Sequence, residues 1–290
     1  MALSERGVGA PVVSLGALLN QTASSVSGST TTSLADYAAE IVQSGFPALR
    51  TLSGRALRIQ LNGYLQRIID TDVSEQGRSV RRPELLRRWI TAYAAATATT
   101  ASYETIRDAA TGGDGDKPAK TTTQPYRDVL ERLWIVDPVP AWTPSQNYLN
   151  RLSRSPKHHL ADPALAARAL GMNVEALLGT EGIMLGNLFE SLVTLSVRVF
   201  AQKAEAHVGH LRLHGGRHEV DLIVERPDRR VLAIEVKLNA AVRDADVENL
   251  KWLRDQIGPA LVDSIVINTG PEAYRRKDGI AVVPAALLGP

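Results

Sequence analysis

The last third of the chain carries the pattern that most limits its fold: a helical segment, three short apolar runs, a second helical segment and one more apolar run. The first helix is expected over about residues 185–204, where apolar residues recur at helical spacing. The three apolar runs have strand character and are separated by turn signals; they cover residues 208–213, 219–224 and 231–236. A helix near residues 247–253 then leads to an apolar strand at 264–268. Because a helix that crosses between two strands of one sheet makes them parallel, this order predicts an α/β module with a parallel pair at its end.

The preceding part of the chain is helical. Apolar residues fall on one helical face in residues 34–42, 57–69 and 126–134, and Pro83 suits the first turn of another helix, where no backbone N–H is needed. Ile135-Val136 is expected to form a short strand, and residues 103–108 lie where the recognition helix of a helix-turn-helix would fall. This order fits a winged-helix arrangement, although any small helical bundle shows the same pattern.

Length and composition divide the chain into three parts. Residues 21–33 are almost all Ser, Thr, Gly and Ala, which bury too little apolar surface to order a segment by themselves. The 290 residues are enough for two domains. We therefore expect a flexible N-terminal segment at residues 1–33, a helical, winged-helix-like domain at 34–180 and an α/β domain at 181–290. The overall class is α/β, or α+β when the helical part is included.

Composition also excludes several kinds of site. The chain has no cysteine, so a metal must be held by oxygen or histidine ligands, and disulfides and cysteine nucleophiles are excluded. No apolar run is expected to approach the roughly 20 residues that cross a bilayer, and the N-terminus lacks the layout of a signal peptide. These features predict a cytoplasmic protein.

Charged residues interrupt two of the apolar strands. Asp221 lies on one strand, and Glu235 and Lys237 lie two residues apart on the next, where alternate residues share a face. Unpaired buried charge costs several kcal/mol, so such a group needs compensation. Two carboxylates with water are the ligands that Mg²⁺ or Mn²⁺ prefers, and the sequence therefore predicts a site for a hard divalent cation.

The order of these residues resembles that of a known superfamily. An aspartate, a spacer of about a dozen residues and then Glu-x-Lys is similar to the motif of the PD-(D/E)xK phosphodiesterases, which include restriction endonucleases and repair nucleases. The segments around the motif resemble the C-terminal domain of unknown function behind the ATPase module of bacterial and archaeal AAA-type ATP-binding proteins; they are residues 186–193, 219–224, 233–237, 266–270 and 280–288. Ser44-Gly45-Phe46-Pro47 and Asp162-Pro163 extend this resemblance upstream.

The resemblance implies a role for each residue. Asp221 and Glu235 would bind the metal, and Glu190 on the preceding helix would complete the ligand set. Lys237 would position or activate water and stabilise phosphorane charge, so Lys237, Glu235 and Asp221 are the catalytic candidates. Glu219, two residues before Asp221, is an alternative ligand. Each residue also has a plain structural interpretation, as a strand-surface ion pair, a hairpin residue or a helix-surface charge.

One feature of that family is missing. No G-x-x-x-x-G-K-[ST] phosphate loop occurs in the sequence, so no nucleotide cofactor and no ATPase activity are expected from this chain alone.

Basic and histidine-rich stretches suggest further sites. The densest basic run is suited to the nucleic-acid backbone, or equally to a solvated helix face; it contains Arg78, Arg81, Arg82, Arg87 and Arg88. Four histidines gather on the strand region, but their spacing spans several kinds of structure, and we expect solvent-facing hairpin residues rather than a metal site; they are His207, His210, His214 and His218.

Two functions follow from these patterns. The leading hypothesis is a DNA-binding, metal-dependent phosphodiesterase, and the alternative is a catalytically inactive module that binds nucleic acid or a partner protein. DNA is the expected partner, with an ATPase module or another protein as a further candidate, and no membrane is involved.

Overall fold

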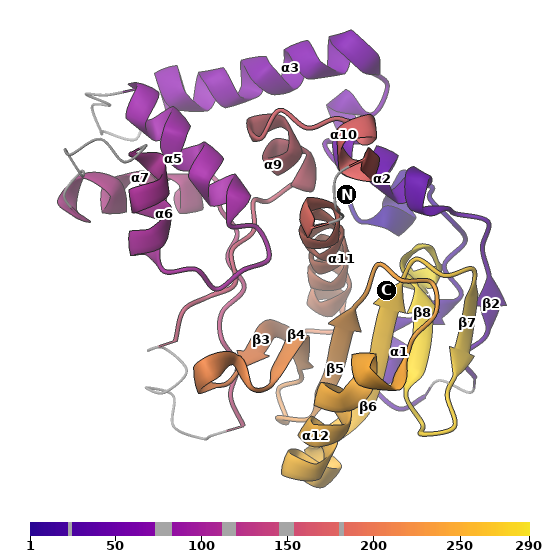
Figure 1. Cartoon of the computed structure of the whole chain (residues 1–290). Helices are drawn as coiled ribbons and strands as arrows, with labels where there is room; N and C mark the ends of the chain where they lie inside the picture. Colours follow the sequence, from indigo (N-terminus) through magenta and orange to yellow (C-terminus); the bar gives the residue numbers. More distant parts are fainter. Residues whose placement is uncertain (23–24, 73–82, 112–119, 145–153, 180–182) are drawn as a thin grey trace. The chain divides into compact units, whose positions relative to one another are not determined.

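The computed structural model describes all residues except 23–24, 73–82, 112–119, 145–153 and 180–182, and it divides into two compact units (Figure 1). One unit contains a β-sheet, and we call it the sheet unit; it consists of Met1–Tyr37, Val139–Pro156 and Leu192–Pro290. The other is built from helices, and we call it the helical unit; it consists of Ala38–Pro138 and Lys157–Ser191. The α/β class predicted from the sequence is confirmed.

The sheet unit is organised around a seven-stranded mixed sheet with the order β2-β7-β8-β6-β5-β4-β3. Strands β5, β6 and β8 run parallel, and the remaining pairs are antiparallel. The strands are β2 (Gly28–Ser29), β3 (His207–Arg212), β4 (Glu219–Glu225), β5 (Val231–Val236), β6 (Leu261–Asn268), β7 (Glu272–Arg275) and β8 (Ala281–Pro284). The predicted parallel pair is confirmed, because β5 and β6 are parallel neighbours in the sheet. Helix α12 (Glu248–Ile257) connects them along the chain.

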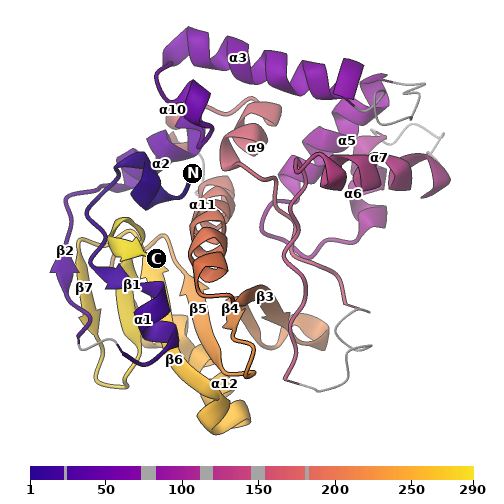
Figure 2. The same cartoon turned by 180° about the vertical axis from the view of Figure 1, so that it is seen from behind.

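Strand β5 is an interior strand of the sheet, between β6 and β4, and all six of its residues are buried. On one face, Val231 and Ala233 pack in an apolar cluster with Leu250 and Leu253 of α12. Helix α1 (Leu15–Leu19) lies on the opposite face, as comparison of Figures 1 and 2 shows. A strand covered on both sides reads as a continuous apolar run, and this is why β5 was recognisable from the sequence.

The N-terminal segment differs from its prediction. Residues 1–33 contain a 3₁₀ turn (Leu3–Arg6), β1 (Val13–Ser14), α1 and β2. Strand β1 pairs in parallel with β9 (Leu288–Gly289), and β2 pairs with β7. The prediction of a flexible segment at residues 1–33 is therefore wrong for the described residues. The composition argument counted only local apolar surface, whereas these residues are ordered by pairing with the far end of the chain.

Strand β4 contains an irregularity next to the polar residues of interest. Gly209 of β3 pairs with Ile223, and Leu211 pairs with Val220, so two residues of β4 lie opposite the single His210. Asp221 is one of those two residues. A bulge of this kind re-aims a side chain and increases the local twist.

The helical unit confirms most of the helices expected from periodicity. It contains the last part of α2 (Leu34–Gln43), α3 (Gly54–Arg67), α5 (Pro83–Ala95), α6 (Tyr103–Ala110), α7 (Lys120–Arg132), α9 (Pro163–Ala169), α10 (Val174–Gly179) and the first part of α11 (Ile183–Lys203). The strand expected at Ile135-Val136 is wrong, because Val136 forms only an isolated bridge with Leu160.

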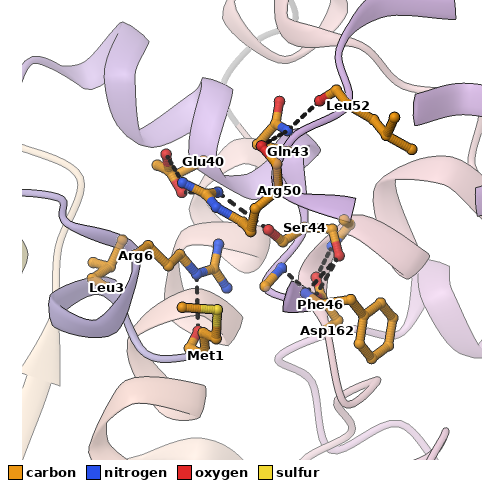
Figure 3. A network of polar contacts seen from close by, with 12 residues as sticks. Met1, Leu3, Arg6, Glu40, Gln43, Ser44, Phe46, Arg50, Leu52 and Asp162 are labelled. Carbon is orange, nitrogen blue, oxygen red and sulfur yellow. Dashed lines mark hydrogen bonds and ion pairs between the residues drawn. The ribbon is translucent and has the colours of Figure 1, made fainter. Parts of the chain in front are cut away.

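A polar network joins two motifs of the helical unit that are more than 100 residues apart in sequence (Figure 3). Asp162 is the N-cap of α9 and accepts a hydrogen bond from the Ala164 N–H at 2.8 Å. Its other carboxylate oxygen accepts from the Ser44 hydroxyl at 2.9 Å and from the Gly45 N–H at 2.6 Å. One buried carboxylate therefore caps a helix and also holds the loop that ends α2.

Helix α11 requires a correction to the membrane prediction. Its segment Met184–Lys203 is long and apolar enough to cross a membrane by length and composition, although no such run was expected. However, 61% of this segment is buried in the protein, as in the core helix of a soluble protein.

The Asp162 network generates a stability prediction. Asp162→Ala removes the cap of α9 and leaves the buried Ser44 hydroxyl and Gly45 N–H without this acceptor. We expect the free energy of unfolding to fall by about 2–4 kcal/mol, since buried donors that lose a charged acceptor carry a desolvation penalty. Urea unfolding followed by circular dichroism measures this loss.

Asp128→Ala is the matched control in the same unit. Asp128 is 41% exposed and pairs with Arg127 at 3.3 Å, so its removal is expected to change stability by less than about 0.5 kcal/mol. Equal effects of the two substitutions would contradict the assigned role of Asp162.

Candidate functional site

The β4–β5 ladder brings the two predicted carboxylates together. Leu222 pairs with Ile234, and the same antiparallel register carried one residue further places Asp221 opposite Glu235. Oδ2 of Asp221 accepts a hydrogen bond from the Val236 N–H at 2.9 Å. The bulge in β4 thus turns Asp221 toward β5 instead of leaving it at a hairpin edge.

Glu235 is the most constrained of these residues. It is only 3% exposed, and its Oε2 accepts a hydrogen bond from Nζ of Lys237 at 2.9 Å. Oε1 is buried and receives no hydrogen bond within the described part of the chain. Glu235 and Asp221 are close enough to share a hydrogen bond, which requires a proton on one of them, so this buried carboxylate oxygen has no donor only when both groups are charged.

The electrostatics follow from this burial. Burial raises the pKa of Glu235 well above its usual range, and the nearby charge of Asp221 raises it further, while Lys237 acts in the opposite direction. For Lys237, burial by itself lowers the pKa, but the carboxylates of Glu235 and Asp221 outweigh this effect, so the pKa is raised. Glu235 favours its protonated form and Lys237 its charged form when nothing else is bound.

Asp246 is a further acidic residue of this region that the sequence did not indicate. It lies in a 3₁₀ turn (Asp244–Val247) that leads into α12, and its Oδ2 accepts a hydrogen bond from the Arg243 N–H at 2.8 Å. Its charge also raises the pKa of Lys237. No local pattern marks this residue, because only the packing of α12 against the sheet brings it toward Lys237.

The donor set fits a hard divalent cation in chemistry. Asp221 and Glu235 present carboxylate oxygens, and the buried Oε1 without a donor is the atom that a cation would neutralise. Within the described residues, no group of three or more acidic or histidine side chains is close enough to form a ligand set by itself. A cation here would depend on two carboxylates, with water or substrate oxygens as its other ligands.

Glu190, the third predicted ligand, belongs to the helical unit. Its Oε1 pairs at 2.7 Å with Nζ of Lys157, whose side chain is 1% exposed. Glu190 therefore neutralises a buried lysine, and its role as a metal ligand remains a prediction. Glu219, the alternative ligand, pairs with Arg212 at 2.8 Å.

The predicted nucleic-acid-binding arginines fall in two groups. Arg78, Arg81 and Arg82 lie outside the described residues. Arg87 and Arg88 are on α5, where Arg88 is exposed and Arg87 is half-buried beside α3.

The histidines do not form a common site. His207 is exposed, as expected, but His210 is buried, and its Nε2 lies 3.2 Å from the Ser155 carbonyl oxygen. His218 stacks on Trp252 with ring centroids 4.1 Å apart. The expectation of solvent-facing residues is therefore wrong for His210, because residues 140–142 pair with β3 at that point through backbone hydrogen bonds to His210.

Comparisons with known proteins give two family matches. Residues 34–176 match the model of a domain of unknown function (DUF8612), and residues 185–288 match that of another (DUF4143). The second family typically forms the C-terminal domain of proteins that contain an AAA-type ATPase, in agreement with the resemblance seen in the sequence. No curated protein and no solved structure gives a significant match.

The raised pKa of Glu235 predicts a distinctive pH dependence of stability in metal-free protein. Below its ordinary value of 4.5, the carboxyl is protonated in both the folded and unfolded states. At higher pH the unfolded chain releases a proton that the folded protein keeps, so the free energy of unfolding falls as pH rises through the folded pKa. Lys237 stays charged throughout this window because its pKa is raised above 10.5. We expect a decline of up to about 1.4 kcal/mol per pH unit that is absent in Glu235→Gln.

Urea unfolding of both proteins at a series of pH values, with a chelator present, measures the difference. Asp228→Asn is the control, because Asp228 is 46% exposed at the turn between β4 and β5, and it should keep the decline. Parallel stability curves for wild type and Glu235→Gln would contradict the raised pKa.

Proposed function

We propose that the sheet unit is a metal-dependent phosphodiesterase module of the PD-(D/E)xK type and that the helical unit, which we propose to be winged-helix-like, binds DNA. The observation that carries this proposal is the buried Oε1 of Glu235, which lies opposite Asp221 and receives no hydrogen bond from the described residues. A fold tolerates such an arrangement only with a proton or a cation between the carboxylates.

The residues of the site have complementary roles in this proposal. Asp221 and Glu235 would hold Mg²⁺ or Mn²⁺, and a bound ion of this kind polarises a phosphate and lowers the pKa of a bound water. Lys237 would place its ammonium group where negative charge develops on the phosphorus centre. Its raised pKa keeps this group charged at neutral pH.

The bond between Lys237 and Glu235 also supports a second candidate. The Nζ–Oε2 distance of 2.9 Å is that of a direct ion pair, which would neutralise the carboxylate without a metal. In that case the sheet unit would be a catalytically inactive module that binds nucleic acid or a partner protein, such as an ATPase module. The family match to a domain that typically follows an AAA-type ATPase is compatible with both candidates.

Cleavage assays separate the two candidates. Single- and double-stranded DNA are incubated with wild type, Asp221→Asn and Glu235→Gln in Mg²⁺, in Mn²⁺ and in a chelator. We expect metal-dependent cleavage by wild type and a loss of at least about 100-fold in rate in each variant, because each removes one of two protein ligands. Lys237→Met should lower the rate while retaining metal binding.

Asp228→Asn serves as the control carboxylate on the same hairpin and should cleave like wild type. Calorimetric titration of Mn²⁺ into each protein reports metal binding independently of cleavage. If wild type and the two carboxylate variants leave DNA equally intact, the enzyme proposal fails and the inactive module is supported.

A further inference from the structure

A hollow of about 510 Å³ lies within the helical unit, where residues of α3, α5 and α9 meet. Two of its lining residues are arginines from different helices, Arg87 of α5 and Arg168 of α9. The described residues that line it include no aspartate or glutamate.

Side-chain amides hold both guanidinium groups. Nε of Arg168 donates to Oδ1 of Asn62 at 2.6 Å, and Nη2 of Arg87 donates to Oε1 of Gln66. Both amides belong to α3. An amide oxygen orients a guanidinium but carries no net charge, so the positive charge of Arg168 remains available to an external anion. The charge of Arg87 is partly offset, because Gln66 also donates a hydrogen bond to the carboxylate of Asp70.

The remaining contacts of these arginines leave donors available. The two Nη nitrogens of Arg168 make no hydrogen bond or ion pair within the described part of the chain. Arg87 pairs with Glu84 at 3.7 Å, but the Glu84 side chain is 78% exposed, where an ion pair contributes little. Other arginines of this unit differ: Arg50 pairs with Glu40 at 2.7 Å in a partly buried, bidentate contact.

The surface of α3 extends the positive charge beyond the hollow. The helix carries Arg55, Arg58 and Arg67 and has no acidic residue along its 14 residues. All three arginines are exposed. Arg55 and Arg58 make no side-chain hydrogen bond or ion pair within the described residues. A basic helix beside a hollow with two oriented guanidinium forks is suited to a backbone that carries regularly spaced anions.

We infer that the hollow between α3, α5 and α9 binds a phosphate group of a nucleic-acid backbone through Arg168 and Arg87, with α3 contacting neighbouring phosphates. The inference rests on the proposed function for the identity of the ligand. It adds Arg168 and α3, which the basic run in the sequence did not include. Since backbone contacts carry no base information, the site should bind different sequences equally well.

Fluorescence anisotropy with labelled single- and double-stranded oligonucleotides, measured across a range of NaCl concentrations, tests the inference. We expect Arg168→Gln and Arg87→Gln each to weaken binding roughly five- to tenfold and to reduce the slope of log K against log salt by about one. Arg168→Lys keeps the charge but loses the fork, and it should give a smaller loss in affinity with an unchanged slope. Circular dichroism and thermal unfolding confirm that each variant is folded.

Arg132→Gln is the matched control, because Arg132 is an exposed arginine of α7 that does not line the hollow. Affinities and salt slopes of the Arg168 and Arg87 variants that equal those of this control would overturn the inference. Competition with inorganic phosphate distinguishes a free-anion site: a hollow that binds phosphate alone and no oligonucleotide also overturns it. Cleavage is measured separately, so failure of the catalytic proposal leaves these binding outcomes unchanged and interpretable.

Discussion

The burial of Glu235 in the interior strand β5 is the constraint on which the sheet unit depends. Strand β5 is covered on both faces and pairs with β4 on one side and β6 on the other, so all six of its residues are buried. A carboxylate in such a strand must be compensated locally, since water cannot reach it. Lys237 donates one hydrogen bond to Glu235. The bulge in β4 brings Asp221 opposite Glu235, and this second negative charge raises the pKa of Glu235 further. An apolar residue at position 235 would pack more simply, and this is the physical basis for the proposal that Glu235 holds a cation.

In the helical unit, two buried charged side chains have partners within the protein. Lys157 is fully buried and is matched by Glu190, and Asp162 receives three hydrogen bonds from two segments. The charges of Lys157 and Asp162 are therefore compensated within the protein, and their contacts stabilise the fold. Arg168 is instead oriented by a neutral amide, and Arg87 by a neutral amide together with an ion pair to the exposed Glu84. The proposals for Glu235 in one unit and Arg168 in the other therefore rest on the same criterion, which is how far a charge is neutralised within the protein.

Much of this could be predicted from the sequence where the cause is local. The strands of the sheet unit and the crossover helix follow from apolar runs and turn residues, and Glu235 and Lys237 were placed on one face by the two-residue period of a strand. What the sequence did not reveal depends on distant pairing. Residues 1–33 are ordered by pairing with strands from the other end of the chain. Asp246 comes near Lys237 only through the packing of α12. Arg168 is oriented by Asn62, which is 106 residues away in the sequence. The basic run groups arginines that are neighbours in the sequence, whereas the hollow combines arginines from separate helices.

The two candidate sites differ in whether they need a metal ion before they can bind a phosphate. A phosphate site of oriented arginines needs no metal and binds any backbone, so its affinity is set by salt. The carboxylate site repels a backbone unless a cation or protons first reduce its charge, because the negative charges of Asp221, Glu235 and Asp246 act on a single lysine. In the proposed function, binding of nucleic acid to the helical unit would not require an occupied carboxylate site, whereas approach of a phosphodiester to the sheet unit would. Metal occupancy at Asp221 and Glu235 would then decide whether bound nucleic acid is only held or also cut.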